Sequence, residues 1–526
     1  MENLWTSYIY LTFAPRIHNK FSRHTNTETR MNTGFFGIIR CQPNSPKMEC
    51  YHAGNHVRKV FDKHPYSIDS IVFDVMQIFK LNSIVRHTRF EKQEGYAVTE
   101  VLALLIMFPL MMLSSVNSFF HSEFQAITTM KKDTLYRLKN NEGVPWRPIL
   151  YGIASRFQKI VNPDKIVAAH AAFILDDTTD LRVGRRLENV SYVFDHVIGK
   201  TLWGFKHLVL GFFDGTTFIP LDFTIHAEQR LRGRKRREQY QKTCRLGSPG
   251  AIRRKECAGD KMTQAIAMVK RAVKHGFPAH YVLADSWFGS KGFIQAIRQI
   301  KNGALHVVCG VRKDKRQYLY QGNTVNAKAL LTILKKASNA KRCRKLNTRY
   351  YEVVVHYEDI GDVKLYVCRF PYQKRWRVFL STDTTLSFVA MMEIYATRWT
   401  IEVFFKEMKQ QLRLGRCQSR DFDAQIAHVT TCCILYTFLA YFRRVHAYVP
   451  LGALFEGMAA ELVEKNLAER LWALFEELLE VVVRSIADSG AVDLPQFKRS
   501  PEYAILQALF EESFLGHQLQ ALNKPA

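Results

Sequence analysis

The sequence predicts an α/β protein with a mixed β-sheet at its centre and helical regions before and after it. Two observations support this prediction. Apolar runs at 167–175, 208–213 and 217–223 have the length and composition of buried strands, and an Asp-Gly dipeptide between the last two is a strong hairpin signal. Between residues 264 and 308, helical and strand-like segments then alternate, which is typical of parallel strands joined by crossover helices.

The later elements of this block follow from their hydrophobic periodicity. It predicts a helix at 264–275, a strand at 280–284, a helix at 291–300 and a strand at 305–308. Strand-like runs at 350–355 and 363–368 interrupt the pattern, which predicts a β-rich insertion over 311–372. The main pattern resumes with a strand at 376–380 and one long helix from about Ser387 to Leu414.

The charge balance of the chain predicts a polyanionic partner. The 526 residues include 75 Lys and Arg against 48 Asp and Glu, for a net charge of +27. A field of this sign attracts nucleic acid, although a basic protein without such a partner has the same composition. The most basic stretch, Arg230 to Lys261, is interpreted either as a DNA-contacting linker or as a solvated loop.

Cysteine usage and apolar segments restrict the class of protein further. The ten cysteines form no CxxC pair and no HExxH motif occurs, so neither a disulfide framework nor a zinc site is predicted. The apolar stretch 101–116 is short for a membrane span, and we interpret it as a buried helix. The N-terminus lacks the pattern of a signal peptide, so we expect a cytoplasmic protein.

Acidic residues stand at the ends of two predicted strands. Asp176 and Asp177 follow the first strand, and Asp285 follows the strand at 280–284. Carboxylates at this edge of an α/β sheet fall where ligands usually bind. Aspartates at strand ends also cap turns, so each signal alone is weak.

The predicted helix 387–414 carries a distinctive charged stripe. Six side chains recur at spacings of three and four, which places them on one face: Tyr395, Arg398, Glu402, Lys406, Lys409 and Arg413. One carboxylate among four cations suits a metal ion beside a phosphate backbone. The alternative is a set of i,i+4 salt bridges around Glu402.

These motifs together resemble a known family. Tyr-x2-Arg-x3-Glu-x6-Lys, here Tyr395, Arg398, Glu402 and Lys409, is similar to the signature of bacterial insertion-sequence DDE transposases, a cut-and-paste family that includes the kanamycin-transposon transposase. The segments 175–179 (LDDTT) and 285–289 (DSWFG) resemble the two acidic motifs of that family. The resemblance covers roughly residues 165–415.

The resemblance implies a ribonuclease-H-like fold and assigns roles to residues. It implies Asp177, Asp285 and Glu402 as catalytic metal ligands, with Asp177 favoured over Asp176 because it directly precedes the Thr pair. Two Mg²⁺ ions, for which Mn²⁺ can substitute, suit three carboxylates without His or Cys. The resemblance implies DNA contacts from further residues of the signature helix, namely Tyr395, Arg398, Trp399, Lys406 and Lys409, and the cationic stripe adds Arg413 to the expected DNA-binding residues. For Trp399, core packing is the alternative.

The domain organisation expected from patterns and resemblance has six parts. They are a leader of uncertain structure (1–47), a helical N-terminal DNA-binding region (48–160), two parts of the catalytic domain (161–310 and 373–415) around the β-rich insertion (311–372), and a helical C-terminal dimerisation region (416–526). A short basic helix near Tyr136 predicts either a helix-turn-helix or a solvated helix face.

The expected activity is cut-and-paste DNA transposition by a homodimer that binds terminal inverted repeats and target DNA, with no membrane association. Three alternatives remain: a metal-dependent DNA nuclease of the same fold, a catalytically inactive DNA-binding derivative, and a membrane protein that uses 101–116. Strand transfer, cleavage and membrane sedimentation would distinguish them.

Overall fold

The computed structural model describes residues 75–445, apart from short gaps, and three later positions. The gaps are 91–94, 112, 114, 123–124, 126–127, 185, 196–197, 228–239, 313 and 372, and the later positions are 499, 501 and 503. The predicted leader therefore lies outside the described residues, as does most of the region 416–526. The described residues form two compact units, a larger one with 79–106 and 133–445, and a smaller one that includes 75–78 and 107–132.

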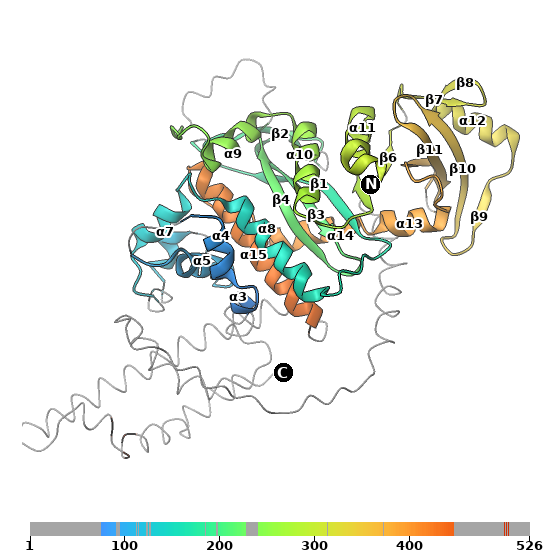
Figure 1. Ribbon diagram of the computed structural model, residues 1–526. Coiled ribbons are helices and arrows are strands. Elements are labelled where there is room, and N and C mark those ends of the chain that lie inside the picture. The colour runs from blue at the N-terminus through green and yellow to red at the C-terminus, as the bar shows by residue number, and fades with distance from the viewer. Residues whose placement is uncertain are drawn as a thin grey trace, which may run out of the picture. The chain divides into compact units, whose positions relative to one another are not determined.

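A mixed sheet of twelve strands is the framework of the larger unit (Figure 1). The strand order is β2-β3-β1-β5-β6-β12-β11-β10-β7-β8, with β4 paired to β3 and β9 paired to β10. β1 runs parallel to β5 and β5 parallel to β6, while the other pairs are antiparallel. The strands are β1 Ala172–Leu181, β2 Ser191–Asp195, β3 Lys200–Phe213, β4 Phe218–His226, β5 Tyr281–Ala284, β6 His306–Val311, β7 Gln317–Tyr320, β8 Asn323–Asn326, β9 Lys341–Cys343, β10 Thr348–Tyr357, β11 Gly361–Arg369 and β12 Arg377–Ser381.

The first strands differ from the sequence-based expectation at one important point. β3 and β4 form the predicted hairpin, with Phe213 opposite Phe218 across the Asp-Gly turn. β1, however, begins later than expected and continues to Leu181, so Asp176 and Asp177 lie inside the strand instead of following it. The strand continues because its antiparallel partner β3 provides hydrogen-bonding groups along its whole length.

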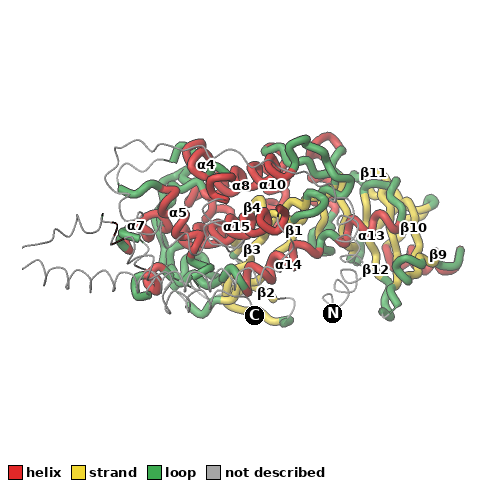
Figure 2. The backbone as a smooth tube through the Cα atoms, turned by 90° about the horizontal axis from the view of Figure 1, so that it is seen from below, coloured by secondary structure: helices red, strands yellow, loops and turns green. Residues whose placement is uncertain are grey.

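Helices cover both faces of the sheet. The described helices are α3 Val75–Ile78, α4 Leu81–His87, α5 Val98–Met107, α6 Val116–Phe119, α7 Lys132–Lys139, α8 Trp146–Val161, α9 Pro249–Ala258, α10 Lys261–Lys274, α11 Lys291–Gln299, α12 Ala327–Ala337, α13 Phe388–Ala396, α14 Trp399–Gln410 and α15 Phe422–Val445. Figure 2 shows α10 and α14 on opposite sides of β1 and β3. Side-chain contacts agree, because neighbouring residues of β1 reach Lys261 of α10 and Arg398 before α14.

The predicted single helix over 387–414 is wrong. The chain forms two helices, α13 and α14, which are separated at Thr397 and Arg398. At this break the Thr397 hydroxyl donates to the Ile394 carbonyl oxygen at 2.7 Å, and backbone bonds span three residues instead of four. Tyr395 therefore belongs to α13, and Arg413 lies beyond α14 with a left-handed φ of 57°, so the six residues do not share one helical face.

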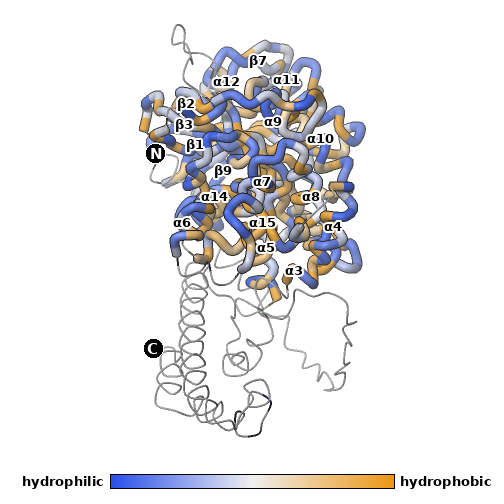
Figure 3. Tube along the Cα trace, turned by 90° about the vertical axis from the view of Figure 1, so that its left-hand side faces the viewer, coloured by the Kyte–Doolittle hydropathy of each residue, from blue (hydrophilic) through white to orange (hydrophobic). Residues whose placement is uncertain are grey.

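The longest helix of the described chain is buried inside the protein. α15 has 24 residues and is long and apolar enough to cross a membrane, but 89% of its most apolar window is buried. It packs against α8 and β4, and Figure 3 colours both α15 and α5 mostly as hydrophobic. α5 has only ten residues and is mostly buried, as expected of the segment from 101. Burial on all sides explains why such helices lack a polar face.

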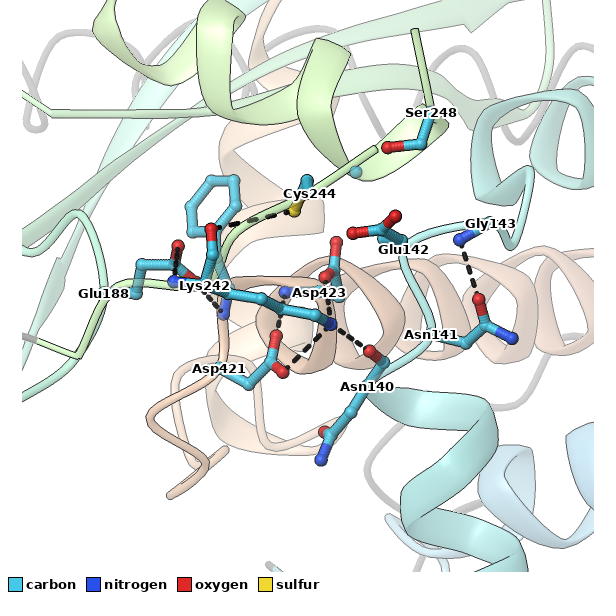
Figure 4. Close-up of polar contacts among 12 residues, drawn as sticks. Asn140, Asn141, Glu142, Gly143, Glu188, Lys242, Cys244, Ser248, Asp421 and Asp423 are labelled. Atoms are coloured by element: carbon cyan, nitrogen blue, oxygen red, sulfur yellow. Dashed lines mark hydrogen bonds and ion pairs between the residues drawn. The ribbon is translucent and has the colours of Figure 1, made fainter. Parts of the chain in front are cut away.

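The predicted basic linker is partly built into the fold. Its residues 230–239 lie outside the described chain, but Lys242 binds three segments at once (Figure 4), and its backbone N–H donates to Glu188 at 3.2 Å. Its ammonium group lies 2.8 Å from Asp423 and 3.2 Å from Asp421, and it also contacts the Asn140 carbonyl oxygen. Arg254 joins the same group by a 2.9 Å ion pair with Asp423. These cations stabilise the protein interior, so the DNA-contact interpretation fails for them.

A second buried ion cluster holds α8, α9 and α10 against β4. Asp222 of β4 is 1% exposed and accepts from Arg147 at 2.9 Å and from Arg271 at 2.7 Å. Arg253 lies 3.9 Å from the same carboxylate. Burial alone would raise the pKa of Asp222, but the three guanidinium groups outweigh it and lower the pKa to about 2. One carboxylate thus connects three helices to the sheet.

This depressed pKa predicts acid sensitivity. A carboxylate whose pKa falls from 3.8 to about 2 on folding stabilises the protein above pH 3.8, and this stabilisation is lost as the pH falls toward 2. The contribution is about 2 kcal/mol. The difference in unfolding free energy between the wild type and Asp222→Asn should therefore narrow by about 2 kcal/mol over this pH window. Parallel pH profiles would contradict the prediction.

Candidate active site

The parallel pairing of β1 and β5 aligns two carboxylates. Leu175 pairs with Ala284, so the next residue of each strand, Asp176 and Asp285, stands at the same level. Residues in register across a sheet point to the same face, and neighbours along a strand alternate. Asp176 and Asp285 thus share a face, and Asp177 points to the other one.

Arg398 connects Asp176 to the signature helix. Its guanidinium group donates to the Asp176 carboxylate at 2.6 Å and also binds the Glu402 carboxylate. Arg398 is 8% exposed, and it lies at the break between α13 and α14, directly over Asp176 in the middle of β1. The helix break therefore places both Arg398 and Glu402 beside the strand aspartates.

Asp177 has a different environment on the opposite face. Its carboxylate accepts from Lys206 of β3 at 3.2 Å and from Lys261 at the start of α10. The Lys261 ammonium also lies 3.7 Å from the ring centroid of Trp287. Burial would raise the pKa of Asp177, but Lys261 and Lys206 outweigh it and hold the pKa below its usual value. Asp177 is a charge-compensated residue of the interior.

Asp285 is oriented by the backbone that follows it. Its Oδ1 accepts the N–H of Trp287 at 2.9 Å and that of Phe288 at 3.3 Å. These two bonds fix one carboxylate oxygen within the turn after β5. Burial raises the pKa of Asp285 despite the nearby Arg398 and these N–H groups.

A raised pKa of Asp176 distinguishes the face of the sheet that carries Asp176 and Asp285 from the face that carries Asp177. Burial raises the pKa of Asp176 to about 7, with further increases from the charges of Asp285, Asp177 and Glu402. Arg398 is the main opposing charge. A group of carboxylates with too little positive charge around it favours binding of an additional cation.

The donor chemistry of this group fits a hard divalent cation. Asp176, Asp285 and Glu402 supply only carboxylate oxygens, which Mg²⁺ and Mn²⁺ prefer. Among the described residues, no three acidic, His or Cys side chains already converge as a metal cluster, because Arg398 binds two of the three carboxylates. The residue types and the excess of negative charge fit a divalent metal ion. In this structure the Arg398 guanidinium group supplies the positive charge that such an ion would bring to Asp176 and Glu402.

The remaining signature residues differ in accessibility. Tyr395 is 6% exposed and packs on Phe379 with ring centroids 4.9 Å apart. Trp399 is half-buried at the start of α14, whereas Lys406 is exposed. Lys409 donates to the Thr179 carbonyl oxygen of β1 at 2.9 Å. The Arg413 guanidinium is half-buried beyond the helix. Of this set, only Lys406 and Lys409 present exposed cations.

Sequence reasoning missed the lysines that neutralise Asp177. Lys206 lies in an apolar strand and Lys261 begins a helix, and neither stands in a recognisable motif. Alternation along β1 could have separated Asp176 from Asp177. That argument requires the register with β5, which the sequence does not reveal.

The fold and the comparisons with known families point in the same direction. A large mixed sheet with carboxylates side by side on two adjacent parallel strands, Asp176 within β1 and Asp285 directly after β5, and a third on a helix, is consistent with a DDE, ribonuclease-H-like fold. Residues 257–438 match the family model described as "Transposase DDE domain", and residues 125–329 match "DDE superfamily endonuclease". These matches support a DDE-superfamily transposase, a class that acts on DNA and typically uses divalent metals. No curated protein matches the chain.

Proposed function

We propose that this protein is a cut-and-paste DNA transposase that cleaves DNA at the ends of its element and joins them to target DNA. The observation that carries the proposal is the meeting of Asp176, Asp285 and Glu402 around one buried arginine. The three residues lie in β1, directly after β5 and in α14, and it is costly to bury several carboxylates together around a single cation.

The catalytic carboxylates in this proposal are Asp176, Asp285 and Glu402. Asp177, which the family resemblance favours, is replaced by Asp176 because lysines already neutralise Asp177 on the opposite face. The three residues would hold divalent cations, two Mg²⁺ or Mn²⁺ ions in the DDE pattern. When bound, the cations supply Lewis-acid activation of the phosphodiester and of the attacking hydroxyl.

The chain's own residues position the DNA. Lys406 and Lys409 are exposed on α14 beside Glu402, where ammonium groups can neutralise backbone phosphates. Arg398 reaches a phosphate only after it leaves Asp176 and Glu402, and cation binding at these carboxylates would release it. Trp287, two residues after Asp285, lies under the Lys261 ammonium group and donates its backbone N–H to the Asp285 carboxylate.

The remaining assignments extend the proposal to the whole chain. The helical region 48–160 recognises terminal inverted repeats, the residues from 416 onward mediate a homodimer, and the protein works in the cytoplasm. Two DNA ends must be held together for transposition, which is the reason to expect a dimer. Charge supports the DNA partner, since the chain carries a net charge of +27.

A cleavage and joining assay tests the proposed function. The substrate is a labelled duplex with the inverted repeat that flanks the gene, incubated with Mg²⁺ or Mn²⁺. The wild type should cut at the repeat end and transfer that end to other DNA. Glu402→Gln should bind equally well and cut roughly 10³-fold more slowly, because several kcal/mol of transition-state stabilisation are lost.

Other results identify the alternatives. Cleavage without any joined product identifies a nuclease. Binding without cleavage, by both the wild type and Glu402→Gln, identifies a DNA-binding protein and contradicts the proposal.

A further inference from the structure

The insertion carries a long segment without negative charge. From Lys315 to Tyr351 the sequence contains no Asp or Glu, but it has ten cations, namely Lys315, Arg316, Lys328, Lys335, Lys336, Lys341, Arg342, Arg344, Lys345 and Arg349. Those from Lys335 onward are all exposed. On α12, Lys335 and Lys336 remain outward because Leu330, Leu331 and Leu334 bury the opposite face of the helix. The strand-like periodicity of the β-rich insertion gave no indication of this helix.

Three arginines stand side by side across adjacent strands of the insertion. Arg349 of β10 pairs with Arg342 of β9 on one side and with Arg369 of β11 on the other. Cross-strand partners point to the same face, so the three guanidinium groups form one row, which we call the arginine row. Like charges directly opposite each other destabilise a sheet. Within the described chain, none of the three forms an ion pair with a carboxylate.

One end of the arginine row is held by an aromatic ring. The Arg369 guanidinium carbon lies 5.4 Å from the ring centroid of Trp376, and the Lys335 ammonium lies 5.7 Å from the same centroid. The Tyr351 ring supports Trp376, with centroids 5.4 Å apart. Cation–π contacts of this kind fix a guanidinium group without neutralising its charge. The arrangement therefore keeps a repulsive set of cations in place.

Strand registers place the arginine row at the same sheet edge as the carboxylate site. Across the sheet, the residues in register with Asp285 are Gly310 of β6, Phe379 of β12 and Tyr366 of β11. Arg369 lies on β11, the third strand from β5, which is about 14 Å across the sheet. It also lies three residues farther along the strand direction than Asp285, which is about 10 Å beyond Asp285 at this edge. The row faces the α10 side of the sheet, opposite the face that carries Asp176 and Asp285, so a duplex that contacts both must pass around this edge of the sheet.

We propose that the arginine row binds the phosphate backbone of the same DNA duplex that the carboxylate site cleaves. This inference rests on the proposed function for the identity of the substrate. Duplex DNA carries one negative charge per about 1.7 Å of its axis, so it supplies the counter-charge that the row lacks. The contact is independent of base sequence because guanidinium groups bind phosphates, and it uses none of the signature residues.

The salt dependence of DNA binding tests this inference. The full chain is compared with the triple variant Arg342→Gln, Arg349→Gln, Arg369→Gln on the labelled repeat duplex, without metal. The slope of log Kobs against log salt should become shallower by about 2.7, which is 0.9 for each lost phosphate contact. The matched control replaces the same three arginines by lysine, keeps the charge and should keep most of the slope.

The outcomes separate this inference from the proposed function. Equal slopes for the wild type and the glutamine variant overturn the inference, even if the wild type cleaves DNA. A changed slope together with a wild type that never cleaves supports the inference and contradicts the proposed function. If the triple variant does not fold, Arg342→Gln alone, at an exposed edge-strand position, should reduce the slope by about 0.9, and no reduction overturns the inference.

Discussion

Asp176→Asn and Asp177→Asn should have opposite effects on activity and stability. Asp176→Asn should lower cleavage roughly 10³-fold, because a carboxylate of the cation site is lost. Its folding should be unharmed, since burial and neighbouring carboxylates already raise the pKa of Asp176 to about 7. Asp177→Asn leaves Lys206 and Lys261 buried without their partner, so it should cost about 3 kcal/mol of stability.

Thermal unfolding with and without Mn²⁺ measures this difference. A cation that binds only the folded protein raises its stability, by about 2.7 kcal/mol at a hundred times the dissociation constant. The Asp177→Asn protein should melt at a lower temperature and still respond to Mn²⁺. The Asp176→Asn protein should lose that response. The reverse pattern would assign the first metal ligand to Asp177.

Asp222→Asn should produce the largest loss of stability among single substitutions in the ion clusters. Arg147, Arg253 and Arg271 all surround this carboxylate, and Glu256 alone would remain to balance them. Removal of one partner from a buried ion pair costs about 3–5 kcal/mol. The midpoint and slope of denaturant unfolding at neutral pH give the value directly.

A surface aspartate provides the matched control for Asp222. Asp133 pairs with Arg137 at 3.6 Å, and their side chains are 80% and 79% exposed. Because exposed pairs contribute about 0–1 kcal/mol, Asp133→Asn should change stability very little. Equal losses for Asp133→Asn and Asp222→Asn would show that the buried cluster does not stabilise the fold as argued.

Local patterns were sufficient for much of the fold. The β3–β4 hairpin, the strand before Asp285 and the helix after it lie close to their predicted positions. Each depends on residues near one another in sequence, such as an Asp-Gly turn or helical spacing. Glu402 and Asp285 were also identified as site candidates from sequence, through motif spacing and family resemblance.

The missed elements depend on contacts between distant residues. The break at Thr397 occurs in a segment without Pro or Gly, where side-chain bonds to the backbone and the fit of Arg398 over β1 decide its position. α12 was hidden in a region of strand-like periodicity. Arg253 and Arg254 appeared in sequence as part of a DNA-contacting linker, but acidic residues far along the chain bind them in the interior.

The sequence by itself determined the residue types of this protein: a basic chain, two adjacent aspartates after a predicted strand, and a helix that carries Glu402 among cations. Only the tertiary structure decided which aspartate joins Glu402 and which cations remain available to DNA. The reason is register. Adjacent strand residues face opposite sides of a sheet, so pairing with β5 directs Asp176 toward Arg398 and Asp177 toward Lys261. The same pairing rule aligns Arg342, Arg349 and Arg369, which are separated along the chain.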